Sequence, residues 1–409
     1  MSPPPEADLT VAPAVQSDSL DIFRADTRAW LEANCPQEMR APVLGEEDVC
    51  WGGRHWQFKS EAQSVWLQRM AERGWTVPEW PRTYGGGGLT KEEAQVLREE
   101  MARLKCRSPL TSFGISMLGP ALLKYGSEAQ KQEHMLRIAR GEIRWCQGYS
   151  EPGAGSDLAS LQTRADDDGD HFLINGSKIW TSYGDKADWI FCLVRTDFSV
   201  GKHDGIGFVL FDMQSPGITT RPIRLISGHS PFTQTFFDNV RVPKANLLGE
   251  RNKGWTIAKY LLTHERNMIG GMGLGLRVGG SATLGQMAVT NIGLAGGRLA
   301  EPALRTDIAR FEMDAQAFAL TMARVQAEAK AGNETGAMSS MLKYYGTELN
   351  KRRAELMMSI TGMESLRFGA GGEELAPIWL RTRANSIEGG SSEIQLNILA
   401  KHVLRLPGA

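Results

Sequence analysis

Apolar side chains recur every three or four residues through the first part of the chain, which is the spacing of helices buried along one face. One stripe begins at Leu20 and predicts a helix that ends near Asn34, before Pro36. Thr90, followed three positions later by Glu93, has the pattern of a capping box and predicts the start of another helix. The chain is therefore expected to begin with a helical domain.

The pattern changes between residues 146 and 250 to short apolar runs separated by turn residues, which is typical of β-strands. The runs cover residues 171–174, 187–194, 206–213 and 235–242. Asn175-Gly176 follows the first run, and this dipeptide between apolar runs predicts a hairpin turn. We therefore expect an antiparallel β domain here.

Helical periodicity returns after Gly254. Its clearest stretch runs from Leu304 to Ala329, where apolar residues alternate at spacings of four and three, as in a helix of a bundle or of a subunit interface. Gly332-Asn333 is expected to end this helix. The predicted class is α+β, with a disordered tail over residues 1–18, an N-terminal α-helical domain over 19–145, a middle antiparallel β domain over 146–250 and a C-terminal helical bundle over 251–409.

Charge and cysteine content exclude several classes of function. Lys and Arg number 46 against 47 Asp and Glu, so no broad cationic surface is expected for nucleic acid or an anionic membrane. The five cysteines are scattered without a Cys-x-x-Cys pair, so neither a disulfide framework nor a thiolate metal site is indicated. With no secretory or transit signal and no membrane-spanning segment expected, the sequence favours small-molecule chemistry in the cytoplasm.

The densest group of residues suited to ligand binding lies at the start of the middle domain. Ser150 to Asp157 form a Gly/Ser-rich loop, whose backbone N–H groups and hydroxyls suit a pyrophosphate. Trp180, within Lys178-Ile-Trp-Thr-Ser182, offers a flat apolar face to an aromatic ring. Taken alone, this pattern fits either an anionic aromatic ligand or a Gly-rich turn beside a buried Trp.

The same stretch resembles the signature of the acyl-CoA dehydrogenases, flavoproteins that bind FAD and an acyl thioester of coenzyme A. Two further segments resemble this family in the expected order, namely Glu79-Trp80-Pro81 with Tyr84-Gly85-Gly86, and the run from Ile387 to Gln395. The resemblance extends over nearly the whole chain and implies an acyl-CoA dehydrogenase-like fold whose C-terminal domain is a four-helix bundle.

The resemblance also implies which residues bind the ligands. The expected FAD contacts are Gln147, Tyr149, Ser150, Trp180, Ser182, Gly389, Gly390, Ser391 and Glu393. Ser156 and Arg266 are expected on the acyl-CoA side of the site. Ser391 equally fits a helix N-cap, and no metal site is implied.

The family reaction removes the α-proton of the acyl thioester while hydride leaves the β-carbon for the flavin, which yields a trans-2-enoyl-CoA and requires a carboxylate base. In many members the base is a Glu at the position where this chain has Gly389, with Glu388 one residue too early. Other members place it in a Leu-x-x-Glu-Arg-like sequence, which matches Leu262 to Arg266. Glu265 is therefore the predicted base, with Glu388 as the alternative.

One family position is occupied differently here. Most members carry Arg-x-x-Phe-Gly on a helix that reaches the neighbouring subunit's FAD, where this chain has Asn291 to Ala295. Relatives that lack this cation are often one half of a heteromeric dehydrogenase. The resemblance therefore leaves open a homodimer, a homotetramer or a hetero-oligomer with a related chain.

The resemblance implies an electron-transfer flavoprotein as the electron acceptor. The alternatives are an oxidase that uses oxygen directly and a non-catalytic subunit of a heteromeric enzyme. A base on the first C-terminal helix occurs among relatives that act on branched, long or bulky acyl chains, including steroid side-chain thioesters. A bulky or branched acyl group, and hence a role in fatty acid or steroid degradation, is therefore expected.

Overall fold

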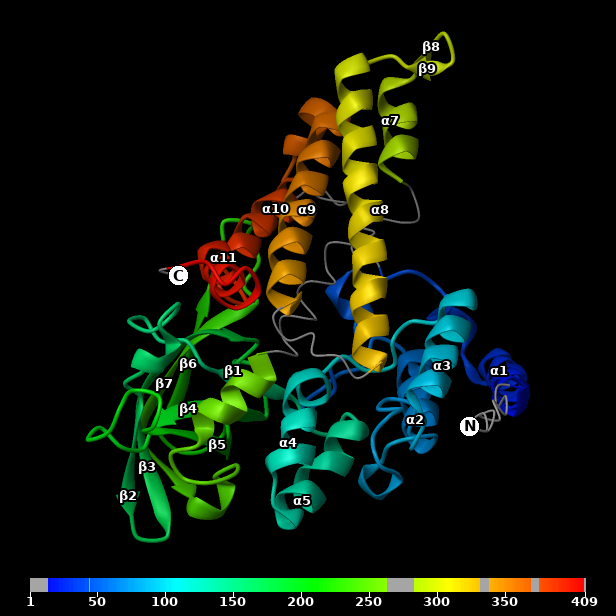
Figure 1. Cartoon of the computed structure of the whole chain (residues 1–409). Helices are drawn as coiled ribbons and strands as arrows, with labels where there is room; N and C mark the ends of the chain where they lie inside the picture. The colour runs from blue at the N-terminus through cyan, green and yellow to red at the C-terminus, as the bar shows by residue number, and fades with distance from the viewer. Residues whose placement is uncertain (1–13, 44, 263–282, 332–337, 369–374, 408–409) are drawn as a thin grey trace, which may run out of the picture. The chain divides into compact units, whose positions relative to one another are not determined.

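The computed structural model describes residues 14–43, 45–262, 283–331, 338–368 and 375–407, and the chain falls into two compact units (Figure 1). The first unit comprises residues up to 115 together with 131–143, and the second comprises 116–130 and 144–409. The helices of the first unit are α1 (Ala14–Asn34), α2 (Glu61–Glu72), α3 (Lys91–Arg103) and most of α5 (Glu128–Ala139). The predicted N-terminal helical domain is thereby confirmed.

The helix ends in the first unit follow from the residues placed there. The α3 capping box is confirmed, because the Thr90 hydroxyl accepts a hydrogen bond from Glu93 N–H at 3.2 Å and the Glu93 carboxylate accepts one from Thr90 N–H at 2.8 Å. Helix α1 ends at Asn34 as predicted. It begins at Ala14, inside the predicted tail, since the last helix-breaking residue before it is Pro13.

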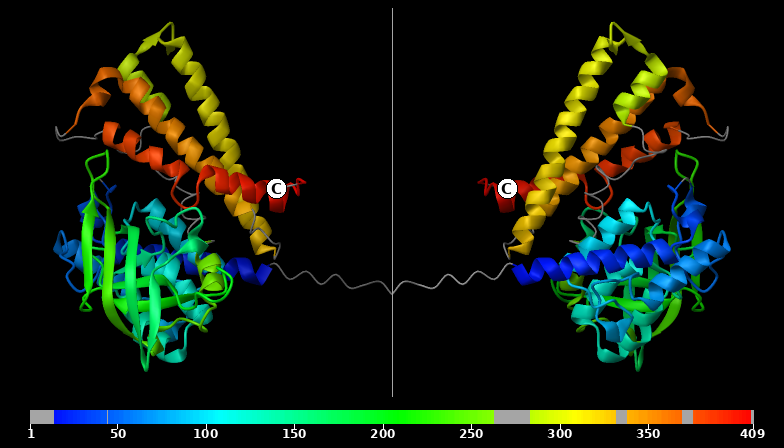
Figure 2. Two further views of the ribbon diagram at one scale, coloured as in Figure 1. Left: turned by 90° about the vertical axis from the view of Figure 1, so that its left-hand side faces the viewer. Right: turned by 90° about the vertical axis from the view of Figure 1, so that its right-hand side faces the viewer.

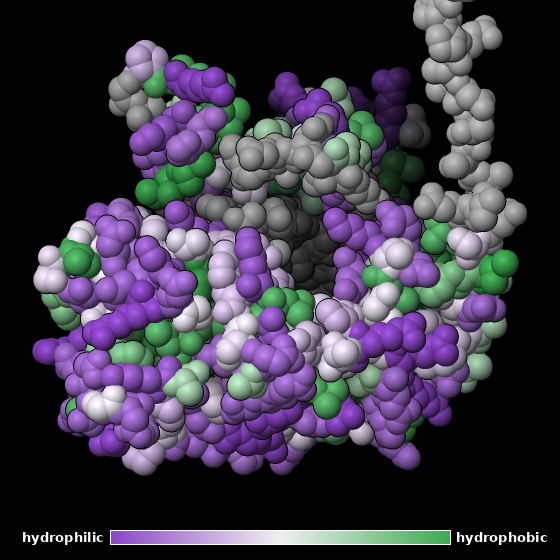
Figure 3. Space-filling view, turned by 60° about the horizontal axis from the view of Figure 1, so that its bottom comes forward, coloured by the Kyte–Doolittle hydropathy of each residue, from purple (hydrophilic) through white to green (hydrophobic). Residues whose placement is uncertain are grey.

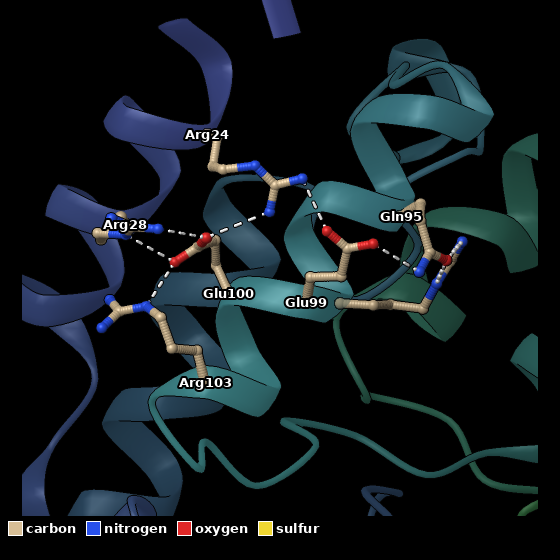
Figure 4. A network of polar contacts seen from close by, with 7 residues as sticks. Arg24, Arg28, Gln95, Glu99, Glu100 and Arg103 are labelled. Carbon is tan, nitrogen blue, oxygen red and sulfur yellow. Dashed lines mark hydrogen bonds and ion pairs between the residues drawn. The ribbon is translucent and has the colours of Figure 1, made fainter. Parts of the chain in front are cut away.

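A buried carboxylate joins α1 to α3 (Figure 4). Glu100 is 2 % exposed and accepts hydrogen bonds from Arg28 at 2.9 Å, from Arg103 at 2.7 Å and from Arg24 at 3.3 Å. The hydrogen bond from Arg28, reinforced by the other two guanidinium groups, lowers the pKa of Glu100 to about 2. Glu100 therefore stays ionised in the fold far below the pH at which an unfolded glutamate becomes protonated.

Replacing Glu100 with Gln is expected to cost about 2 kcal/mol of stability at pH 7, because three arginines lose a shared buried partner. The wild-type contribution is fully present above pH 4.5, the ordinary glutamate pKa, and disappears as the pH falls through about 2. Thermal unfolding of the wild type and the variant between pH 7 and pH 3 measures this contribution. The difference in stability between the two proteins should shrink only below pH 4.5. The exposed neighbour Glu99, which pairs with Arg24 at 2.7 Å, gives the control variant Glu99→Gln, and an equal loss there would refute the prediction.

The middle of the chain forms a seven-stranded sheet with the strand order β1-β4-β2-β3-β7-β6, and β5 also pairs with β4. The strands are β1 (Trp145–Gly148), β2 (Arg164–Asp168), β3 (His171–Ser182), β4 (Trp189–Arg195), β5 (Ile206–Asp212), β6 (Ile218–Ile223) and β7 (Phe232–Pro243). Most pairs are antiparallel as predicted, but β1 runs parallel to β4 and β2 meets β4 in parallel at one position. A parallel pair needs a long crossover, and the segment between β1 and β4, which includes the β2–β3 hairpin, supplies it.

The predicted hairpin turn at Asn175-Gly176 is wrong, because both residues lie within β3. Asn175 instead accepts a hydrogen bond at 2.9 Å from the N–H of Asn239 on β7, at a bulge in the β3–β7 pairing. Gly176 has φ +144° there, and a Cβ would lie 2.7 Å from the hydroxyl of Thr163. The Asn175 side chain and the missing Cβ of Gly176 thus allow the bulge to form. The chain turns earlier, at Gly169.

The C-terminal part is helical, as predicted (Figures 1 and 2). Its elements, after helical residues 254–262, are α7 (Leu284–Ile292), β8 (Leu294–Ala295), β9 (Arg298–Leu299), α8 (Pro302–Lys330), α9 (Met338–Thr361), α10 (Leu375–Thr382) and α11 (Ser392–Ile398); α4 (Gly119–Tyr125) also belongs to this unit. Helices α7, α8, α10 and α11 each pack against α9, which agrees with the expected helical C-terminal domain. The apolar stripe of α8 is buried at Leu304, Ile308, Phe311 and Phe318, while Gly332-Asn333 lies outside the described residues.

One face of the molecule is mainly polar. The face in Figure 3 is dominated by hydrophilic residues, and its hydrophobic residues form only small scattered groups. Over the described ranges, none of the helices combines the length and the apolar character that a membrane crossing requires.

Candidate functional site

A buried ion pair holds the Gly/Ser-rich loop against β3. The Lys178 side chain is fully buried, and its ammonium donates to the Glu151 carboxylate at 2.8 Å and to the Tyr149 carbonyl at 3.0 Å. Glu151 also accepts from the N–H groups of Gln162 at 2.6 Å and Thr163 at 2.9 Å. Burial acts to raise the pKa of Glu151, but Lys178 and these donors outweigh it and lower the pKa below the usual value. The loop is therefore anchored at its first residues.

This anchor brings several predicted site residues together. Ser150 lies beside β3, because its carbonyl accepts a hydrogen bond from Ile179 N–H at 2.8 Å. The ring of Tyr149 is buried and meets Phe191 and Phe208 edge-on. Gln147 is half-buried on β1. Ser156 is exposed further along the anchored loop.

Trp180 is displayed outward by an irregularity in β3. It has φ +61° between Lys178 and Thr181, where the pairing with β7 shifts register. Its side chain is 52 % exposed and meets Phe232 on β7 edge-on, with ring centroids 6.0 Å apart. A non-glycine residue at positive φ is strained, and such residues concentrate at ligand sites. The alternative of a turn beside a buried Trp is therefore wrong, and the open indole face suits a flat aromatic ligand.

The C-terminal motif forms a tight turn into α11. Gly389 and Gly390 have φ +66° and +88°, and a Cβ at position 390 would lie 2.4 Å from the side-chain nitrogen of Gln395. Ser391 is the N-cap of α11, with its hydroxyl accepting from Ile394 N–H at 3.4 Å. The N-cap expectation for Ser391 is confirmed. Glu393 is exposed in the first helical turn.

Two buried polar atoms beside this turn lack hydrogen-bond partners within the described ranges. They are the side-chain oxygen of Gln395 and the hydroxyl of Ser392. An unsatisfied buried polar group costs about 1–3 kcal/mol, which a polar ligand offering a hydrogen bond would recover. The turn therefore fits a polar cofactor as well as a structural role.

Arg381 on α10 connects the two parts of the site, and sequence reasoning missed it. Its guanidinium carbon lies 5.5 Å from the ring centre of Phe232, the residue that packs against Trp180. The same guanidinium binds Glu388 at 2.7 Å, and Glu388 also accepts from the Asn385 side chain at 2.5 Å. Ser182 pairs with Phe232 in the sheet. No local sequence pattern marks Arg381, because the contact depends on how α10 packs.

Glu265 and Arg266 lie outside the described residues. Asn291, at the family's arginine position, lies near the end of α7, where its side chain donates to the Met287 carbonyl at 2.8 Å. The Asn291 side chain is therefore hydrogen-bonded within its own helix.

Comparison with known proteins covers nearly all of the chain. Sequence profiles match three consecutive segments, described as the acyl-CoA dehydrogenase N-terminal domain over residues 20–142, middle domain over 146–240 and C-terminal domain over 252–404. A Mycobacterium tuberculosis (strain H37Rv) protein named acyl-CoA dehydrogenase IpdE1 is 35 % identical over 398 residues, covering 95 % of this chain and 98 % of that protein.

Solved structures give the same result. The Tcur3481-Tcur3483 steroid ACAD matches with a TM-score of 0.72 and 30 % identity, covering 98 % of this chain and 99 % of that chain. The ChsE4-ChsE5 complex from Mycobacterium tuberculosis matches with a TM-score of 0.71 and 27 % identity, covering 98 % of this chain and 100 % of that chain. Each of these two names refers to two different chains.

Proposed function

The chain belongs to the acyl-CoA dehydrogenase family, and from this premise we propose that it dehydrogenates a bulky acyl-CoA thioester with Glu265 as the base. Members of this family are FAD-dependent oxidoreductases. The observation that carries the proposal is the similarity to a steroid ACAD over 98 % of the chain, together with the open face of Trp180 beside an anchored loop. A steroid-type or branched acyl group is the proposed substrate class.

The described residues fit FAD. We assign the exposed face of Trp180 and the adjacent Tyr149 and Ser150 to the flavin ring, and the turn at Gly389 with the unsatisfied oxygen of Gln395 to polar parts of the cofactor. Bound FAD would accept the hydride and so supply the redox chemistry.

The other step of the reaction is removal of the α-proton of the thioester, which requires a carboxylate of this chain. Glu388 already binds Arg381 and Asn385, and Gly389 has no side chain, which supports Glu265 as the base. Ser156, exposed on the anchored loop, is assigned to the thioester side, and Arg266 is proposed to steady the charge of the adjacent carboxylate.

A panel of acyl-CoA thioesters tests the substrate class. Purified protein with bound FAD should lose its oxidised flavin absorbance quickly with steroid-type or branched acyl-CoAs, and slowly with short straight-chain ones. Faster reaction with a short straight chain would overturn the substrate proposal.

We propose an electron-transfer flavoprotein as the acceptor and a cytoplasmic location; peroxide released in air at the rate of substrate loss would indicate an oxidase instead.

We further propose that the chain works in a hetero-oligomer with a related chain. Asn291 supplies no cation where a homo-oligomeric enzyme would use one for the neighbouring subunit's FAD, and two structural relatives are named as pairs of different chains. The chain produced alone should therefore hold clearly less than one FAD per chain, and co-production with a genomic neighbour of the same family should raise the FAD content. One FAD per chain in a pure, active homo-oligomer would contradict this.

A further inference from the structure

Helix α9 has a row of buried polar side chains as well as the apolar residues that join the hydrophobic core. The polar row consists of Ser340, Lys343, Thr347 and Asn350. Its spacings of three, four and three residues place the four side chains along one side of the helix. Buried polar groups need partners inside the protein, so this side of α9 is built for polar contacts with the chain that packs on it.

Lys343 is the charged member of the polar row. Its side chain is fully buried, and burial lowers the pKa of its ammonium. Within the described part of the chain the ammonium makes one hydrogen bond, to the Asn385 carbonyl at 3.0 Å, and no ion pair, although it has three N–H donors. An apolar side chain of similar volume is often at least as stabilising as a buried charged group. Stability of the fold alone therefore does not account for a lysine at this position.

The polar row holds Asn385 by two separate bonds. Asn385 is buried in a short 3-10 turn directly before the glycines that lead into α11. Its backbone carbonyl accepts from Lys343, and its side-chain oxygen accepts from the Asn350 side chain at 2.8 Å. The second bond orients the Asn385 amide so that its NH₂ group donates to the Glu388 carboxylate at 2.5 Å. Helix α9 thus fixes both the backbone and the side chain of Asn385.

The backbone from Ala384 to Gly389 has little freedom to adjust independently. The Ala384 carbonyl accepts hydrogen bonds from the N–H groups of Ile387 at 2.8 Å and Glu388 at 3.0 Å. The Gly389 carbonyl accepts one from the Gln395 side chain at 3.1 Å. A shift of the 3-10 turn would therefore move the glycine turn as well.

We propose that Lys343 is a positioning residue for FAD: through Asn385, its ammonium holds the Gly389-Gly390 turn in the conformation that binds the cofactor. The inference rests on the proposed assignment of this turn to FAD. Lys343 acts through Asn385 and takes no part in proton or hydride transfer. A lysine with a merely structural role could be replaced by Met without loss of FAD affinity, whereas a positioning residue could not.

Lys343→Met, studied in the full-length protein alone and in complex with a related chain, tests the proposal. The variant should keep its Tm within about a few degrees of the wild type, because the Met side chain fills the same space. Its Kd for FAD should rise by about tenfold or more, which corresponds to one lost hydrogen bond to a charged group. In the FAD-free protein, hydrogen exchange of the amides of residues 387–391 should become about tenfold faster, while exchange in α8 stays unchanged.

Two outcomes of this experiment are adverse, and they can be told apart. A folded Lys343→Met protein with the wild-type Kd for FAD would overturn the positioning role and leave the proposed function intact. A wild type that binds no FAD, even in complex with a related chain, would refute the proposed function and this inference together.

Asn350→Leu gives the same test without removal of a charge, and it decides the question if Lys343→Met does not fold. It should also raise the Kd for FAD, because Asn385 loses its other bond to α9. In the double variant the two fold changes should not simply multiply, since both act through Asn385. Simple multiplication would show two independent effects and would overturn the proposal.

Arg352→Met is the matched control on the same helix. Arg352 pairs with Asp314 on α8 at 2.6 Å, and both side chains are partly exposed. Its loss should leave the Kd for FAD within about twofold of the wild type, because the pair makes a small contribution and does not contact the glycine turn. A loss of FAD affinity equal to that of Lys343→Met would show that any disturbance of α9 weakens binding, and would overturn the proposal.

Discussion

Glu265→Gln is expected to lower kcat by about 10³-fold or more, because a positioned general base contributes factors of this order and an amide cannot accept the α-proton. Gln has nearly the same shape as Glu, so FAD content should stay at the wild-type level and acyl-CoA should still bind. The measurement is flavin reduction by acyl-CoA in single turnovers under anaerobic conditions, which isolates the chemical step from reoxidation. If the variant lost its flavin, a fold defect and not a missing base would explain the loss.

Glu388→Gln is the matched comparison. Glu388 binds Arg381 at 2.7 Å and Asn385 at 2.5 Å, so its carboxylate supports the turn before α11. The variant should lose some stability and FAD affinity but, once saturated with FAD, should reduce its flavin within a few-fold of the wild-type rate. The opposite result, with a fast Glu265→Gln and a slow Glu388→Gln, would move the base to the C-terminal motif. Full activity in both variants would refute both assignments.

The sequence predicted the helices best, because a helix end is a local event. The stop before Pro36, the capping box at Thr90 and the stripe of α8 all depend on residues within a few positions of one another, and all three agree with the structure. The sheet was predicted less well. Arg164–Asp168 is too acidic to look like a strand, yet it pairs with β3 over its whole length. Asn175-Gly176 has the composition of a turn, but its partner Asn239 lies far along the chain.

In the site, too, features set by neighbouring residues were predicted and features set by tertiary packing were not. Motif spacing identified Trp180 and the loop after β1. It did not predict that Trp180 points outward, because this depends on an irregularity in the pairing of β3 with β7. Arg381 was missed, because its contact with Phe232 joins segments that only tertiary packing brings together.

Lys178→Met is expected to destabilise the second unit by about 3–5 kcal/mol, because it leaves the Glu151 carboxylate buried without its cation. The loop that carries Ser150 and Ser156 should loosen, so FAD should dissociate more readily. Chemical denaturation and FAD titration measure the two effects. Lys202→Met is the control, since Lys202 pairs with Asp157 on the same loop at 2.8 Å but both side chains are more than half exposed, and its loss should cost less than about 1 kcal/mol.

The pH dependence distinguishes a buried charge from lost packing at Lys178. In the wild type the pKa of Glu151 is lowered, so its contribution is present above the ordinary glutamate pKa and is lost as the pH falls through the folded value. In Lys178→Met, burial raises the pKa of Glu151 because the neighbouring cation is gone. Protonation of Glu151 at lower pH then removes the free-energy penalty of a buried unpaired carboxylate. The stability gap between wild type and Lys178→Met should therefore narrow from pH 8 to pH 5. A gap that stays constant over this range would show that the methylene packing of Lys178, and not the ion pair with Glu151, holds the loop to β3.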